Sequence, residues 1–120
     1  MNDPHRLPIA VAALIAGLVM GGSANALDAD KAQILARQSG CLKCHAVDKK
    51  KDAPAYRDVA AKYKGNPNAE SKLINHVTSG EKVKFEDGHE EEHKIVKSKD
   101  PVEIKNLVDW ILSLEGGTKY

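Results

Sequence analysis

Cys41-Leu42-Lys43-Cys44-His45 contains the only two cysteines of this 120-residue chain, followed directly by a histidine. This C-x-x-C-H spacing is typical of the covalent attachment of a c-type haem. Two thiols three positions apart can each add to a vinyl group of the porphyrin, which leaves His45 aimed at the iron. A chain this short has a marginal hydrophobic core, so a bound prosthetic group is expected to organise its fold.

Other uses of a cysteine pair fit this sequence less well. A thioredoxin-like redox pair is expected near a βαβ pattern, and none is visible. A structural zinc site needs more ligands, usually a second cysteine pair, and the chain has none. An oxidising compartment permits a simple disulfide, but the adjacent His45 favours haem.

The first 26 residues are typical of a secretory signal. Arg6 precedes the largely apolar stretch Leu7 to Gly22, and Ala24-Asn25-Ala26 is an A-x-A cleavage site. We therefore expect residues 1–26 to be a signal peptide and residues 27–120 to be one domain, exported to the periplasm. The alternative is an uncleaved membrane anchor, because the apolar stretch approaches the length that spans a bilayer.

The charges are balanced overall but segregated along the chain. Eighteen basic and 17 acidic residues argue against a nucleic-acid-binding protein, which requires a basic excess. Acidic residues gather between Glu86 and Glu92. Four lysines surround the cysteine motif, and we expect them to form a basic rim that steers an acidic partner into transient contact: Lys43, Lys49, Lys50 and Lys51.

Helical signals dominate the rest of the chain, and no segment shows sustained strand alternation. The predicted helices cover Asp28 to Gln38, Tyr56 to Tyr63, the segment from the Asn68 cap to Ser79, and the segment from the Asp100 cap and Pro101 to Leu114. His76 is expected on the solvent side of the third of these helices. Glu81 to Lys99 is expected to be irregular, so the fold class is all-α.

Three stretches together resemble the small bacterial class I monohaem cytochromes c: Gly40 to His45, Ala53 to Tyr63 and Leu107 to Leu114. The resemblance implies four to five helices wrapped around one covalent haem, attached through Cys41 and Cys44, with His45 as the proximal iron ligand. It also implies that the Pro54 carbonyl accepts a hydrogen bond from His45. The family usually has glycine before this proline, and here Ala53 departs from the pattern.

The distal methionine that the resemblance leads one to expect is absent, because Met1 and Met20 are the only methionines and both lie in the predicted signal. The substitute is expected from the segment before the last helix, where His89 and His93 are the best donors and lysines are weaker ones. Counting back from Asp100 favours His93, whereas counting forward from Gly80 favours His89. We prefer His93 and keep His89 as the alternative.

His89 and His93 also satisfy H-E-x-x-H, the zinc-hydrolase pattern, but the segment has no strong apolar face and the short chain offers no obvious substrate cleft. The resemblance instead implies a redox carrier of single electrons, not an enzyme. Imidazole in place of methionine is expected to lower its reduction potential. The alternatives are a haem module that binds nitric oxide or carbon monoxide, and a redox subunit of one dedicated oxidoreductase.

Overall fold

The computed structural model describes residues 16–17 and 26–114. Most of the predicted signal, including nearly all of its apolar stretch and most of its cleavage site, lies outside these residues. Within the described part of the chain, no helix is both long enough and apolar enough to span a membrane.

Helices form most of the described structure. In chain order they are α1 (Ala29–Gln38), the short 3-10 helix η1 (Cys41–Lys43), α2 (Tyr56–Tyr63), α3 (Ala69–Ser79) and α4 (Pro101–Ser113). The four α-helices match the predicted segments within one or two residues at each end. Helices α1 and α4 each begin at an aspartate cap. The Asp28 carboxylate accepts a hydrogen bond from the backbone N–H of Lys31, and the Asp100 carboxylate accepts one from the backbone N–H of Val102.

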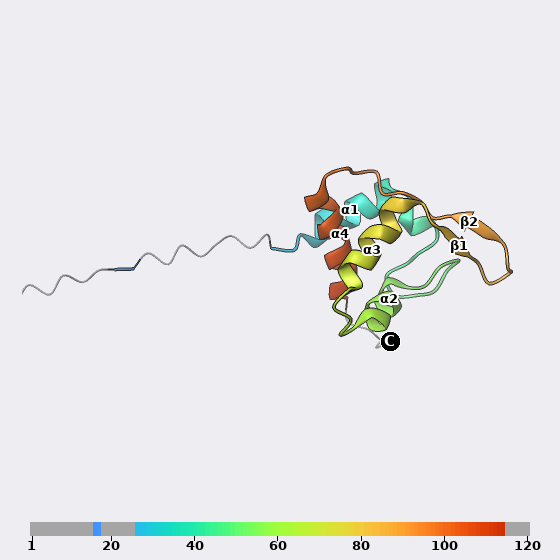
Figure 1. The fold of residues 1–120 in the computed structure, drawn as a ribbon, viewed down its shortest axis with the longest axis horizontal. Coiled ribbons are helices and arrows are strands. Elements are labelled where there is room, and N and C mark those ends of the chain that lie inside the picture. Colours follow the sequence, from blue (N-terminus) through green and yellow to red (C-terminus); the bar gives the residue numbers. More distant parts are fainter. Residues whose placement is uncertain (1–15, 18–25, 115–120) are drawn as a thin grey trace, which may run out of the picture.

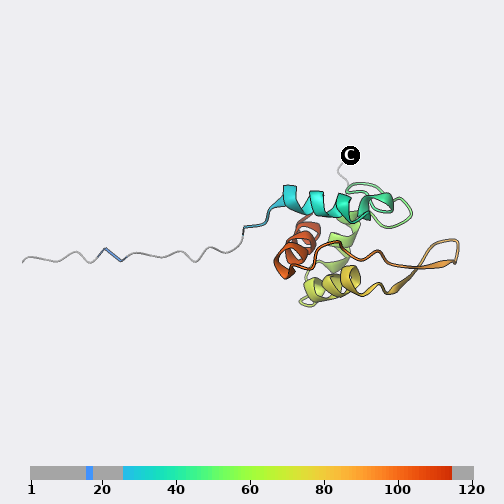
Figure 2. The same cartoon turned by 90° about the horizontal axis from the view of Figure 1, so that it is seen from above.

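Helix α4 lies at the centre, and α1, α2 and α3 each pack against it (Figures 1 and 2). Its apolar residues follow helical spacing, and Leu107 and Val108 are almost completely buried. Asn106 fixes the crossing of α1 on α4 through two hydrogen bonds. Its side-chain oxygen accepts from the Asp28 N–H at 2.9 Å, and its amide nitrogen donates to the Asp28 carbonyl at 2.8 Å.

The segment between α3 and α4 differs from the irregular stretch predicted for it. Strands β1 (Lys82–Lys84) and β2 (Glu90–Glu92) pair antiparallel, with Lys82 opposite Glu92 and Lys84 opposite Glu90. The resulting hairpin projects from the helical body (Figure 2). Its turn includes Gly88 at φ 91°, a left-handed conformation that favours glycine. The strands are short and exposed, so neither carries the apolar alternation by which a strand is recognised.

Candidate functional site

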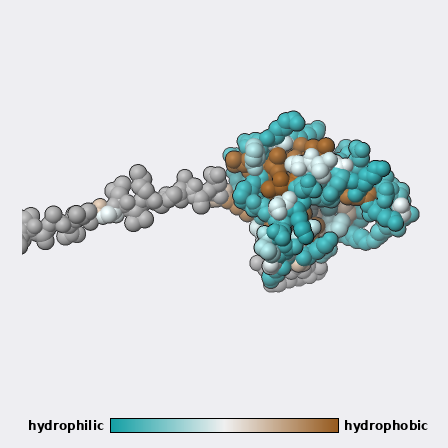
Figure 3. All heavy atoms as spheres, viewed as in Figure 1, coloured by the Kyte–Doolittle hydropathy of each residue, from teal (hydrophilic) through white to brown (hydrophobic). Residues whose placement is uncertain are grey.

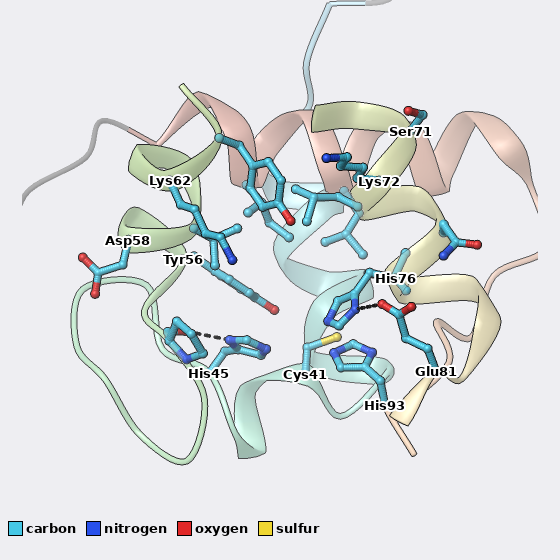
Figure 4. A pocket seen from close by; sticks show the side chains of 18 residues that line it. Cys41, His45, Tyr56, Asp58, Lys62, Ser71, Lys72, His76, Glu81 and His93 are labelled. Atoms are coloured by element: carbon cyan, nitrogen blue, oxygen red, sulfur yellow. Dashed lines mark hydrogen bonds and ion pairs between the residues drawn. The ribbon is translucent and has the colours of Figure 1, made fainter. Parts of the chain in front are cut away.

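A cavity of about 720 Å³ lies between the cysteine motif and helices α2, α3 and α4. Val59, Leu73, Val77, Leu107 and Ile111 supply apolar walls from these helices. Figure 4 shows polar groups at both ends of the cavity, with Asp58 and Lys62 on the α2 side. Cys41, His45, His76 and His93 gather at one end, whereas Lys72 and Ser71 lie toward the other.

The cysteine motif begins where α1 ends. Gly40 has φ 75°, and a Cβ atom there would lie 3.3 Å from the Lys94 side chain, so glycine suits this turn. The backbone N–H groups of Cys44 and His45 both donate to the Cys41 carbonyl. This tight turn brings Cys41 and His45 to the cavity wall, while Cys44 lies half-buried beside them.

His45 is held in one tautomer. Its Nδ1–H donates to the Pro54 carbonyl at 2.7 Å, the contact that the family resemblance implied, and Nε2 remains available as a ligand. The Ala53 N–H donates to the Cys44 carbonyl at 2.9 Å, so the loop closes with alanine at this position. The Tyr56 ring stacks on the imidazole at a centroid distance of 4.9 Å.

The burial of His45 affects its protonation. Burial lowers the pKa of His45, and the nearby His76 lowers it further, against the opposing effect of the Pro54 hydrogen bond. The neutral imidazole is therefore favoured near neutral pH, and only the neutral form has a ring lone pair for a metal.

His93 reaches the same cavity from the strand that leaves the hairpin. Its backbone N–H donates to the Glu81 carbonyl at 2.9 Å, which closes the base of the hairpin. The ring centroid lies 6.4 Å from that of His45, with the two ring planes inclined at 60°. Burial lowers the pKa of His93, and its buried Nδ1 has no hydrogen-bond partner among the described residues.

His89 lies away from the cavity, on the hairpin. Its ring stacks on Phe85 at 4.3 Å, and its two nitrogens face the carboxylates of Asp87 and Glu91. The Asp87 hydrogen bond raises the pKa of His89, so a metal competes with a proton for this ring more than it does for an ordinary histidine. The structure thus brings His93, but not His89, to the cavity that His45 lines.

His76 is a cavity residue that the sequence interpretation placed wrongly on the solvent side of its helix. Its ring centroid lies 3.9 Å from that of His93, and its Nδ1–H donates to the Glu81 carboxylate (Figure 4). Its position on the helix was the sequence signal that could have predicted a side chain facing the cavity. His76 follows Leu73 by three residues and precedes Val77, and both of these are buried against the core.

The basic residues around the motif are exposed: Lys43, Lys49, Lys50 and Lys51. Two of them also have contacts within the chain. Lys50 pairs with Glu86 of the hairpin turn, and the Lys51 ammonium donates to the Leu42 carbonyl at 2.8 Å. The loop that follows the cysteine motif is thereby linked to the hairpin.

Comparisons with known proteins agree with this geometry. The family model described as Cytochrome c matches residues 29–115. The chain belongs to the cytochrome c family. Cytochrome c-551 of Allochromatium vinosum is 40% identical over 81 residues, which cover 68% of this chain and 83% of that protein.

Solved structures extend the similarity to the fold. The class 1 cytochrome MtoD of Sideroxydans lithotrophicus is 64% identical with a TM-score of 0.71, covering 74% of this chain and 98% of that one. Cytochrome c552 of Nitrosomonas europaea is 30% identical with a TM-score of 0.55, covering 73% of this chain and all of its own. The predicted class I cytochrome c fold is confirmed.

This cytochrome c carries one covalently bound haem c and is a redox electron carrier, not an enzyme. The residues that line the cavity fit a covalently bound haem. Cys41 and Cys44 have the attachment spacing, the hydrogen bond from His45 to Pro54 leaves Nε2 for iron, and the cavity begins at Cys41 and His45. The haem supplies the one-electron chemistry, and the chain supplies attachment, ligands and an apolar surrounding.

Proposed function

We propose that this cytochrome c is a periplasmic electron carrier whose haem iron is held between His45 and His93. The observation that carries the proposal is the 6.4 Å separation of the two imidazole centroids. Two imidazoles on opposite faces of one metal ion, each bound through nitrogen at about 2 Å, have their centroids about 6 Å apart. The two rings are therefore spaced to accept an iron between them.

The reduction potential is expected to lie below that of methionine-ligated relatives. Residues 21–120 contain no methionine, and imidazole stabilises ferric iron more than a thioether does. A side-by-side potential measurement with a methionine-ligated cytochrome c-551 tests this order. An equal or higher potential contradicts it.

The ligand itself is tested by comparing wild type with His93→Ala and His89→Ala. These variants remove the same side chain from two positions on the same segment, one at the cavity and one on the exposed hairpin. We expect the ferric electron paramagnetic resonance g-values and the potential to change in His93→Ala and to remain unchanged in His89→Ala. The opposite pattern assigns the iron to His89, and a methionine–iron absorption band in wild type rejects both assignments.

Export to the periplasm rests on the predicted signal at residues 1–26, with cleavage after Ala26. The covalent haem is consistent with this location, since related c-type cytochromes are typically periplasmic. Expression of the full chain with a haem attachment system, followed by intact mass measurement of the periplasmic fraction, tests it. The expected mature chain starts at Leu27. A product of full length in the membrane fraction supports an anchor instead.

Binding of a small ligand is the second candidate function, and one observation favours it. Metal-bound histidines almost always donate their second ring N–H to a partner, whereas Nδ1 of His93 is buried without a well-formed hydrogen bond among the described residues and has only the Lys94 backbone nearby. Such a ligand is expected to dissociate more readily than His45. Titration of the reduced protein with carbon monoxide separates the functions, because a dedicated carrier shows little spectral change and a binding module shows a saturable one.

A further inference from the structure

The outer hydrogen bond that usually supports a metal-bound histidine belongs to His76. Its Nδ1–H donates to the Glu81 carboxylate at 2.5 Å, which selects the tautomer whose Nε2 lone pair is available. A carboxylate that accepts from one ring nitrogen also makes the other nitrogen a stronger donor to metals. Among the described residues, His76 therefore has a carboxylate support that His93 lacks.

His76 is also within reach of the position that His93 occupies. Its ring centroid lies 3.9 Å from that of His93, so it has to move by about its own width to replace that ring. The side chain is 31% exposed, and it lies in the last turn of α3, which ends at Ser79. The backbone at this end of the helix is held in place, because the Val96 N–H donates to the Val77 carbonyl at 2.9 Å, so the movement required is a rotation of the His76 side chain.

Glu81 connects the two histidines. Its backbone carbonyl accepts from the His93 N–H at 2.9 Å, and its carboxylate accepts from His76. The hairpin base and the end of α3 are thus fixed to each other at one residue. Displacement of the His93 side chain leaves the His76–Glu81 pair intact, because that pair uses no atom of His93.

We propose that His76 is a reserve distal ligand, which binds the haem iron when His93 leaves it. This inference rests on the proposed ligation by His93. In this arrangement, loss of the His93 bond does not leave an open coordination position, so small molecules compete with a second imidazole rather than with water. The reserve ligand keeps the protein a six-coordinate electron carrier although its first distal ligand has, in the described part of the chain, no carboxylate partner like Glu81.

The test uses four forms of the haem-loaded protein: wild type, His93→Ala, His93→Ala with His76→Gln, and His93→Ala with His89→Ala. Glutamine at position 76 retains similar length and a hydrogen-bond donor for Glu81 but is a poor iron ligand. The last variant is the matched control, since His89 is the histidine among the described residues that lies outside the cavity. Electron paramagnetic resonance and carbon monoxide titration are the readouts, and far-ultraviolet circular dichroism confirms folding.

We expect His93→Ala to remain low-spin with g-values that differ from wild type, and the His89 control to behave identically. The His93→Ala/His76→Gln protein is expected to become high-spin and to bind carbon monoxide at least about tenfold more tightly than His93→Ala, because a ligand that occupies the iron nine-tenths of the time weakens apparent affinity tenfold. A high-spin His93→Ala protein overturns the reserve role alone, as does a low-spin double variant. Unchanged g-values in His93→Ala overturn the His93 ligation as well.

Discussion

At the scale of single residues, two histidines four positions apart have opposite environments. His93 is half-buried against other imidazoles, which lowers its pKa, whereas His89 is exposed between two carboxylates. The sequence predicted both as candidates because both have the required donor chemistry. The sequence could not decide which of the two histidines reaches the cavity, because that depends on where each one lies relative to the base of the hairpin.

The pKa of His89 is predicted to lie above that of an ordinary histidine and to fall toward it in Asp87→Asn. The Asp87 hydrogen bond is the largest cause of the raised value. A raised folded-state pKa stabilises the protein below the unfolded pKa, and this contribution is lost as pH rises through the folded value. Titration of the His89 ring protons by nuclear magnetic resonance measures the shift. An unchanged midpoint in Asp87→Asn contradicts this explanation.

Sequence reasoning is strongest where chemistry fixes the spacing of residues. The C-x-x-C-H motif predicted a covalent haem, which the cytochrome c family confirms, whereas the roles of Cys41, Cys44 and His45 stay predictions from that spacing. His76 was missed because a histidine on a helix is consistent with either face, and the cavity-facing side is defined only when α3 packs on α4. Sequence patterns therefore identified the attachment chemistry but not the full set of imidazoles in the cavity.

At the scale of elements, the hairpin explains why counting residues back from Asp100 favoured His93 as the distal ligand, whereas counting forward from Gly80 favoured His89. Residues 82–92 loop out from a base closed by the Glu81 carbonyl and the His93 N–H. Counting back from α4 avoids this excursion and reaches the cavity residue, whereas counting forward from α3 enters it. Helix starts are predictable from local caps, but an exposed hairpin of charged residues has no comparable signal.

Shortening the hairpin is predicted to leave the haem environment unchanged. We propose replacing residues 83–91 with Asn-Gly, a two-residue turn that can join Lys82 to Glu92. The ring of His93 and the Glu81 contact remain, and the removed residues are exposed except for Val83 and Phe85, which are half-buried. The absorption and electron paramagnetic resonance spectra should match wild type, with a loss of stability below about 1 kcal/mol. A changed distal-ligand spectrum shows that the hairpin itself positions His93.

Asn106 is predicted to be a major stabiliser of the α1–α4 crossing. Asn106→Ala removes both hydrogen bonds to the Asp28 backbone and leaves partly buried groups without partners. The expected loss in unfolding free energy is about 1–3 kcal/mol. Chemical denaturation measures it, with Val102→Ala as the control on the same helix, because Val102 is 57% exposed and should cost about 0.5 kcal/mol or less. Equal losses in the two variants contradict the assignment.

At the scale of the whole molecule, the arrangement of charge bears on how this carrier meets its partners. Four lysines lie on the loop around the attachment site and five acidic residues lie on the hairpin, with Lys50 and Glu86 joining the two. A nearly neutral chain can therefore still present an oriented field to a partner. The sequence supplied the charges, whereas the Lys50–Glu86 pair required the hairpin to fold toward the loop.

Lys49 is predicted to steer negatively charged partners toward the haem. Lys49→Glu is expected to slow oxidation by ferricyanide about fivefold at low ionic strength and to speed oxidation by a cationic cobalt complex, because the reversed charge acts on the encounter rather than on the iron. Both effects should shrink with added salt, since a Debye length is about 10 Å at 0.1 M.

Lys31→Glu is the matched control, at the opposite end of α1 from Cys41. Stopped-flow rates at several salt concentrations measure the effect, with the reduction potential checked in each variant. An equal change in the Lys31 variant assigns the effect to net charge alone, and a rate independent of salt removes the steering role.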